Sequence, residues 1–133
     1  MTLIGLILAG IAALLHVYIF VMESVTWTSP RTRATFGLSA EQAAQTKEMA
    51  FNQGFYNLFL ALAVGLGILL FALGQTAVGL TLVFTGAGSM VVAGLVLLIS
   101  SPSKASAALK QLTLPLLGVI ALGLGAFALI LGR

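Results

Sequence analysis

The 133-residue sequence contains no cysteine and very little charge. The absence of cysteine excludes disulfides, thiolate metal sites and cysteine nucleophiles. Only 7% of the residues are charged, six of them basic and three acidic, whereas a soluble domain carries about 25% charged residues. So little charge does not suit a surface in water, and the composition therefore indicates a membrane protein whose main partner is the lipid bilayer. The basic residues are also too few for a nucleic-acid-binding surface, so no nucleic acid partner is expected.

Hydrophobic residues make up 60% of the chain and form four long runs. A helix needs about 20 mainly apolar residues to cross a bilayer. The runs predict spans over residues 3–23, 49–73, 78–99 and 109–131. We therefore expect an all-α fold, a single transmembrane domain built as an antiparallel four-helix bundle. The first run is interpreted as a retained span and not as a cleavable signal peptide, because no basic side chain precedes it.

The only substantial polar segment, residues 24–48, separates the first two spans. Within it, Ser29-Pro30 has the pattern of an N-cap followed by proline at the first helical position. Ser39 and Gln42 have the spacing of a capping box. We expect a short helical first loop, in which the second helix continues without a break into the second span.

The basic residues indicate how the chain is oriented. Five of the six lie in or beside the first and third connections: Arg31, Arg33, Lys47, Lys104 and Lys110. The opposite side holds only Arg133 and the amino terminus. Because basic loops stay on the cytoplasmic side, we expect loops 24–48 and 100–108 in the cytoplasm and both termini outside, with the bacterial inner membrane as the location.

Small residues recur one helical turn apart in the apolar runs. The third span has Thr81, Thr85, Ser89 and Ala93 at four-residue spacing, and the fourth contains several glycines. In lipid, small residues allow helix backbones to approach closely, which is the main route to helix association. We expect these residues to pack the spans together, and we expect the protein to form a homo-oligomer.

The polar side chains of the spans gather at one end of the first two. Glu23 closes the first span, and His16 lies seven residues earlier on the same face, about 10 Å deeper. Antiparallel pairing is expected to bring Glu23 level with Asn52 and Gln53, and His16 level with Asn57. The predicted ligand-binding residues are His16, Glu23, Trp27, Asn52, Gln53, Tyr56 and Asn57.

Two interpretations of this cluster stay open. An ionisable residue inside a span costs about 2.5–3.5 kcal/mol on insertion scales, so its presence there calls for a structural or functional explanation. The cluster is either a self-satisfied structural network or a site that binds a ligand. Arg31 and Arg33 stand just outside it and can attract an anion or simply anchor the loop. One histidine and one glutamate do not make a metal site, and no cofactor is indicated.

These residues carry a resemblance to a known family. The sequence resembles the domain-of-unknown-function 1304 family of small four-span membrane proteins, and the Asn-Gln-Gly-x-Tyr-Asn block is its most specific part. The resemblance implies a four-span architecture and brings no reaction with it. The matching segments are His16, Met22-Glu23, Trp27-Thr28-Ser29-Pro30-Arg31, Phe36-Gly37-Leu38 and Asn52-Gln53-Gly54-Phe55-Tyr56-Asn57.

In architecture alone the chain is also similar to the glutathione-using MAPEG membrane enzymes. Those enzymes carry an Arg-x-x-x-Asn-x-x-Glu pattern entering the second span. Here Glu48 and Asn52 have the first spacing, but Glu48 replaces the arginine and Phe55 replaces the glutamate. This similarity implies a scaffold and not an activity.

Three functional classes follow from these observations. The leading hypothesis is a protein that binds, or transports, a small polar or amphipathic ligand in the polar site of the first two spans. The second is an intramembrane enzyme with a soluble thiol cosubstrate, and the third is a structural or accessory membrane subunit.

Overall fold

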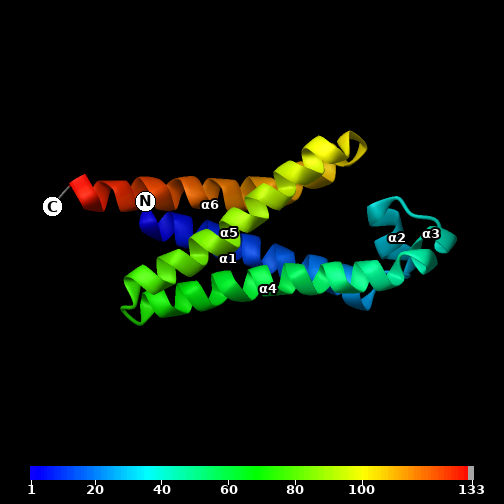
Figure 1. Cartoon of the computed structure of the whole chain (residues 1–133), viewed down its shortest axis with the longest axis horizontal. Coiled ribbons are helices and arrows are strands. Elements are labelled where there is room, and N and C mark those ends of the chain that lie inside the picture. The colour runs from blue at the N-terminus through cyan, green and yellow to red at the C-terminus, as the bar shows by residue number, and fades with distance from the viewer. Residues whose placement is uncertain (132–133) are drawn as a thin grey trace.

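The computed structural model describes residues 1–131, so Arg133, which entered the orientation argument, lies outside the described residues. Four long helices dominate the fold (Figure 1). They are α1 (Thr2–Phe20), α4 (Lys47–Ala72), α5 (Thr76–Ser100) and α6 (Ala105–Leu131). Within residues 1–131, four helices are long and apolar enough to cross a membrane. The predicted all-α membrane bundle is therefore confirmed.

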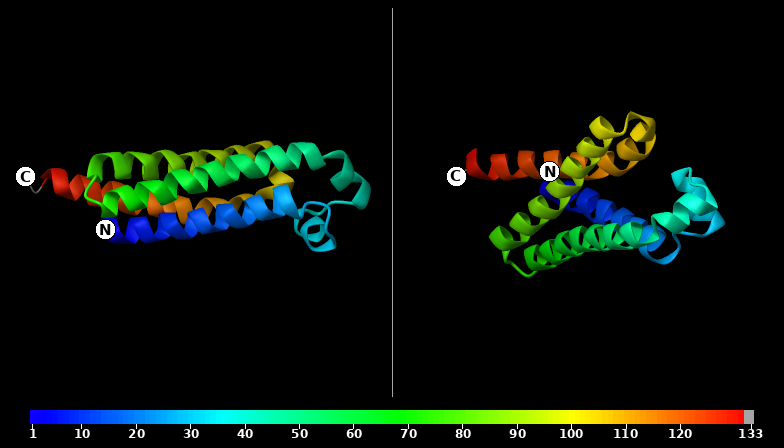
Figure 2. Two further views of the ribbon diagram at one scale, coloured as in Figure 1. Left: turned by 90° about the horizontal axis from the view of Figure 1, so that it is seen from below. Right: turned by 45° about the vertical axis from the view of Figure 1, so that its right-hand side comes forward.

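The helices form a ring in which each packs against its antiparallel neighbours. α1 packs against α4 and α6, while α5 packs against α4 and α6 from the opposite corner. Figures 1 and 2 show that the first residue of α1 and the last turn of α6 lie at one end, with the first loop at the other. This order places the carboxyl end of α1 beside the amino end of α4, as antiparallel pairing requires.

The first loop contains two short helices, α2 (Pro30–Phe36) and α3 (Ala40–Gln45). Ser29 caps α2 by accepting a hydrogen bond from the Thr32 backbone N–H. α2 ends at Gly37, whose φ of 67° lies in the left-handed region that favours glycine. The predicted capping box of α3 is confirmed, because Ser39 and Gln42 exchange side-chain to backbone hydrogen bonds.

The predicted continuous helix from this capping box into the membrane is wrong, because the helix breaks at Thr46. α3 ends one residue before Thr46, whose φ of −101° and ψ of 5° are not helical, and α4 starts one residue after it. The Thr46 hydroxyl donates to the Gln42 carbonyl oxygen at 2.7 Å. A threonine that bonds back to this carbonyl bends a helix, so α3 turns away from the α4 axis.

The third connection is also more helical than expected. A single 3-10 turn, η2 (Pro102–Lys104), leads directly into α6. α6 therefore begins at Ala105, earlier than the predicted start near Leu109, and it continues through Pro115.

Small side chains and glycines let the four helices approach closely. A Cβ atom added at Gly79 of α5 would lie 2.5 Å from the Phe71 backbone nitrogen and 2.7 Å from the Gly67 carbonyl oxygen. Between α1 and α6, a Cβ at Gly118 would lie 3.1 Å from the Ala9 backbone nitrogen. The buried core that results is rich in alanine and valine: Leu6, Ala9, Ala12, Ala13, Ala61, Val64, Val83, Ala87, Met90 and Leu122.

The predicted packing role of one small-residue stripe within the bundle is wrong. Thr81, Thr85, Ser89 and Ala93 all lie on the exposed side of α5. The opposite side of α5 faces α4 and α6, and there Gly86 and Gly94 are buried. Glycine permits a closer backbone approach than threonine does, so the glycine side of the helix is the one that packs inward.

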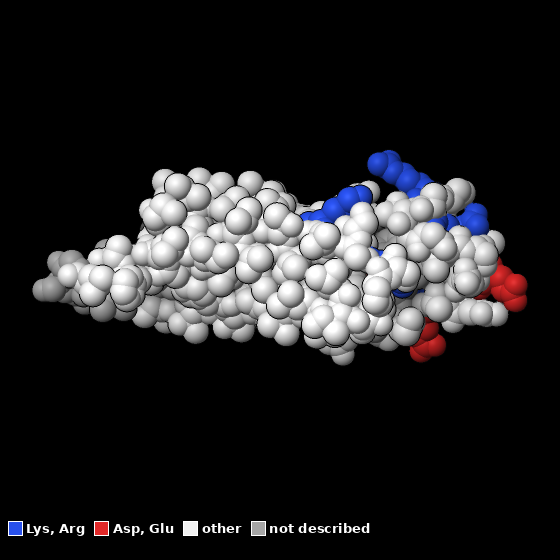
Figure 3. Space-filling model, turned by 90° about the horizontal axis from the view of Figure 1, so that it is seen from above, with Lys and Arg blue, Asp and Glu red and all other residues white. Residues whose placement is uncertain are grey.

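Charged side chains gather at the end of the bundle that holds the first loop, residues 26–46, and η2. Figure 3 shows the basic and acidic side chains of one face at this end, while the rest of that face is uncharged. This end is called the charged end below. It contains the ends of α1 and α4 at which the predicted polar cluster lies.

Candidate functional site

The last turn of the first span is a π-helix, η1 (Val21–Val25). Its wider turn is marked by the hydrogen bond from the Thr26 backbone N–H to the Val21 carbonyl oxygen at 3.0 Å. π-helical turns are rare and occur frequently at functional sites. The extra residue in this turn rotates the following side chains relative to the α-helical face below them.

η1 is attached to α4 by two hydrogen bonds and a close backbone contact. The Asn57 side-chain amide donates to the Glu23 carboxylate at 2.8 Å. One residue on, the Ser24 hydroxyl donates to the Phe51 carbonyl oxygen at 2.8 Å. Gly54 makes this approach possible, because a Cβ there would overlap the Ser24 hydroxyl. The last turn of the first span therefore occupies the space that a side chain at position 54 would need.

The Glu23 side chain has another partner than the predicted level suggested. Glu23 was expected level with Asn52 and Gln53, and its Cβ lies 3.1 Å from where a Cβ at Gly54 would be, but its carboxylate reaches Asn57, about one turn farther along α4. His16 was expected at the level of Asn57, and within residues 1–131 no hydrogen bond joins these two side chains. Among the described residues, one pair of the predicted cluster is joined by a side-chain hydrogen bond, Glu23 and Asn57.

His16 is separate from this pair. The residue is 2% exposed and continues the buried stripe of α1. Its Nδ1 lies 2.9 Å from the Ala12 carbonyl oxygen one turn below, so Nδ1 carries the hydrogen. The imidazole is thus satisfied in part by its own helix, which is the arrangement of a core histidine.

Three other predicted residues face outward from α4. Asn52 and Gln53 are exposed, and Tyr56 is 64% exposed. Within residues 1–131, no side-chain hydrogen bond of these three residues joins them to α1. They do not converge with Glu23 on a shared pocket inside this chain.

Trp27 holds the first loop together. Its indole Nε1–H donates to the Thr46 hydroxyl at 3.2 Å, which ties the end of η1 to the break before α4. Its ring packs against Phe36 of α2, with the ring centroids 4.9 Å apart. Trp27 therefore fixes α2 above the end of α1.

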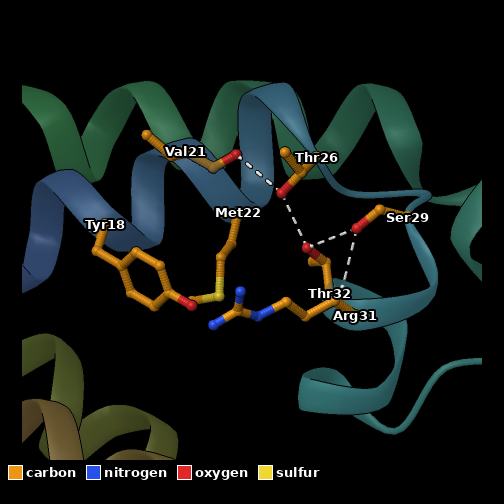
Figure 4. A pocket seen from close by; sticks show the side chains of 7 residues that line it. All are labelled: Tyr18, Val21, Met22, Thr26, Ser29, Arg31 and Thr32. Atoms are coloured by element: carbon orange, nitrogen blue, oxygen red, sulfur yellow. Dashed lines mark hydrogen bonds between the residues drawn. The ribbon is translucent and has the colours of Figure 1, made fainter.

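A cavity of about 230 Å³ lies beneath the first loop (Figure 4), and neither Glu23 nor Asn57 lines it. Figure 4 shows the Arg31 side chain of α2 reaching back along α1, with its guanidinium group turned toward Tyr18 and Met22. The cavity is open on one side. It is lined by Tyr18, Val21, Met22, Thr26, Ser29, Arg31 and Thr32.

Three hydroxyl groups form the polar wall of this cavity. Thr26 and Thr32 lie 2.9 Å apart between their hydroxyl oxygens, and Ser29 donates to Thr32 at 3.1 Å. This series of hydrogen bonds ends where the Thr26 hydroxyl donates to the Val21 carbonyl oxygen at 3.4 Å. Figure 4 shows this series joining η1 to α2. The hydroxyls thereby fix the helix that carries Arg31.

Of the two arginines predicted to attract anions, only Arg31 lines the cavity. Arg33 lies elsewhere on α2, and its Nε is buried without a hydrogen-bond partner among the described residues. Arg31 and Arg33 therefore have different surroundings, although they carry the same charge and belong to the same short helix.

Sequence reasoning missed most of the cavity lining. Tyr18 of α1 and Met22 of η1 are four residues apart on the first span, which places them near one face but does not show what covers that face. Thr26, Ser29 and Thr32 recur every third residue, and only the capping role of Ser29 was readable from that pattern. In residues 1–131 no group of three or more His, Cys, Asp or Glu side chains is placed to hold a metal ion.

One comparison with known proteins gives a match. The model of the family described as "Protein of unknown function (DUF1304)" matches residues 10–123. The chain matches no curated protein and no solved structure. The matched range runs from α1 into α6, so it contains η1, the first loop and all residues that line the cavity.

Proposed function

The chain belongs to the DUF1304 family, and from this premise we propose that it binds, or transports, a small amphipathic molecule at the charged end of α1 and α4. The observation that carries this proposal is the cavity beneath the first loop. It lies at the end of the bundle to which the sequence confines nearly all charged residues. A concave site with a few placed polar groups is the usual form of a small-molecule site.

The chemistry of the cavity walls supports an amphipathic ligand. One side consists of the apolar parts of Tyr18, Val21 and Met22 on the first span. The other side consists of the three hydroxyls and the Arg31 guanidinium from the first loop. A molecule with an apolar part and a polar head would satisfy both sides at once.

In this proposal the Glu23–Asn57 pair positions one wall of the site. The pair, together with the Ser24 to Phe51 hydrogen bond, attaches η1 to α4. Because η1 and the residue that follows it supply Val21, Met22 and Thr26, this attachment sets the width of the cavity. Asn52, Gln53 and Tyr56 lie outside it and meet lipid head groups or another copy of the chain.

We infer that the charged end faces the cytoplasm of a bacterial inner membrane, since basic residues are retained on that side. Within residues 1–131 all five lysines and arginines lie in or near the first and third connections. The chain has no cysteine, so a single Glu41→Cys residue can be labelled selectively. Labelling of Glu41→Cys by a membrane-impermeant reagent in intact cells would contradict this orientation.

We infer further that the protein forms a homo-oligomer. The support is the exposed stripe of Thr81, Thr85, Ser89 and Ala93, whose small side chains allow close helix approach. The mass of the purified complex, measured by native mass spectrometry, tests this inference, and a single-chain mass would contradict it.

The ligand proposal is tested by filling the cavity. Val21→Trp places a large ring at a lining position that is 37% exposed. Val25→Trp is the matched control, because Val25 is 68% exposed and does not line the cavity. The measurement is the thermal unfolding midpoint in nonionic detergent, with anionic, zwitterionic and cationic single-chain amphiphiles added in turn.

We expect at least one amphiphile to raise the midpoint of the wild-type protein and of Val25→Trp. The same amphiphile should not raise the midpoint of Val21→Trp, because the ring occupies its place. The proposal is wrong if no amphiphile stabilises the wild-type protein, or if both tryptophan variants respond as the wild type does.

A further inference from the structure

We infer that the cavity beneath the first loop takes an anionic head group, phosphate or carboxylate, of a single-chain amphiphile, with Arg31 as its charge partner. This inference rests on the proposed function and names the chemical class of its ligand. It is carried by the charge, the free hydrogen-bond donors and the size of the cavity.

Among the described residues, the cavity is lined by one cation and no acid. Arg31 is the only charged residue that residues 1–131 contribute to its lining. Elsewhere, the Glu23 carboxylate accepts from Asn57, and the Glu41 carboxylate accepts from Gln45 at 3.3 Å. The guanidinium group thus has no carboxylate in the cavity to neutralise it, and a planar group with five N–H donors suits a phosphate or a carboxylate.

The free donors of the cavity point to the same class of ligand. The hydroxyls of Ser29, Thr32 and Thr26 are used in a chain that ends at the Val21 carbonyl oxygen. Within residues 1–131, the Tyr18 hydroxyl makes no hydrogen bond, and Figure 4 shows the Tyr18 side chain and the Arg31 guanidinium pointing toward one another. Both residues therefore present hydrogen-bond donors to the cavity that they line, and an acceptor-rich group would satisfy these donors.

The size and opening of the cavity indicate that only the head of the ligand lies inside. Its volume of about 230 Å³ is below the roughly 300–1,000 Å³ of pockets that enclose a drug-sized ligand. Tyr18 and Val21 lie within the first span and are 47% and 37% exposed. An alkyl chain can leave the cavity along these two side chains and remain in the hydrocarbon of the bilayer.

The probe for this inference is dodecyl phosphate, compared with dodecylphosphocholine, dodecyltrimethylammonium and inorganic phosphate. Affinity is measured by titration in nonionic detergent, using the fluorescence of Trp27. Trp27 is the only tryptophan in the chain and packs against Phe36 of α2, the helix that carries Arg31. The unfolding midpoint of each variant without ligand shows whether it is folded.

We expect dodecyl phosphate to bind more tightly than the zwitterionic and cationic amphiphiles. Arg31→Gln should weaken its binding by about tenfold, the effect of losing one charge-assisted hydrogen bond. Arg31→Lys should retain part of the affinity, since it keeps the charge but loses the planar fork. Arg33→Gln is the matched control from the same helix and should leave the affinity unchanged, because Arg33 does not line the cavity.

The inorganic phosphate arm separates the two sources of an anion. Binding of dodecyl phosphate without comparable binding of inorganic phosphate supports an amphiphile, whereas equal binding overturns the claim that an alkyl chain contributes. The inference is overturned if the cationic amphiphile binds as well as dodecyl phosphate, or if Arg31→Gln and Arg33→Gln behave alike. In those cases the proposed function still stands, provided that Val21→Trp abolishes binding and Val25→Trp does not.

Discussion

The two ends of this bundle are held together in different ways. Toward the uncharged end, backbones meet directly at glycines, as between Gly67 of α4 and Gly79 of α5, and the cavity of about 440 Å³ between α1 and α4 there is lined by apolar residues. At the charged end, side-chain hydrogen bonds join η1 and α2 to their neighbours, and a cavity remains between them. Lipid does not drive apolar helices together, so they associate tightly only where their surfaces fit closely, as they do at glycines. Where the chain instead uses hydrogen bonds, polar side chains line the space that remains.

The largest loss of stability is expected when one methyl group is added at the uncharged end. Gly79→Ala would place a Cβ 2.5 Å from the Phe71 backbone nitrogen, where the contact is backbone and cannot rotate away. We expect a loss of about 1–3 kcal/mol in the free energy of unfolding, the usual cost of overpacking. The measurement is reversible unfolding in mixed detergent.

Gly88→Ala is the control for this substitution, because it makes the same change in the same helix with no atom within 4 Å of the new Cβ. It should leave the stability unchanged or raise it by up to about 1 kcal/mol through helix propensity. Equal losses for the two variants would show that close backbone contact is not what holds this end.

A smaller effect is expected when a hydrogen bond at the charged end is removed. Asn57→Ala leaves the Glu23 carboxylate without its amide donor. We expect a loss of roughly 0.6–1.7 kcal/mol, between the average and the largest value measured for polar contacts between membrane helices. Asn52→Ala, at an exposed amide without a side-chain hydrogen bond in residues 1–131, should unfold at the wild-type midpoint. A similar loss for both would mean that the polar cluster works as one network.

The smallest effect is expected in the first loop. Trp27→Phe keeps a ring against Phe36 but loses the N–H that donates to Thr46. We expect about 0.5 kcal/mol, at the lower end for a hydrogen bond, seen as faster amide hydrogen exchange in α3. Thr46→Val removes the other partner and also the Thr46 to Gln42 hydrogen bond, so the double variant should exchange no faster than Thr46→Val alone. Additive effects would place the two residues in separate contacts.

The candidate site was only partly predictable from the sequence. The end of the bundle at which polar residues meet was predicted, and Arg31 was named, because polar residues are rare in spans and stand out. The level of Glu23 beside the start of α4 was predicted, but its partner Asn57 was not, since the sequence does not show in which direction the carboxylate extends. Tyr18 and Met22 were missed because nothing in their own segment shows that α2 folds back over them.

The sequence by itself determined the membrane class, the four spans, the caps of α2 and α3 and the end that carries the charge. These features depend on the length of apolar runs and on contacts between residues three or four positions apart. Only the tertiary structure decided which faces of the spans meet, which stripe of α5 is left outside and where a cavity remains. The spans are apolar on all sides, so their residue pattern does not mark an inner face, and that choice is made by the fit of one helix surface to another.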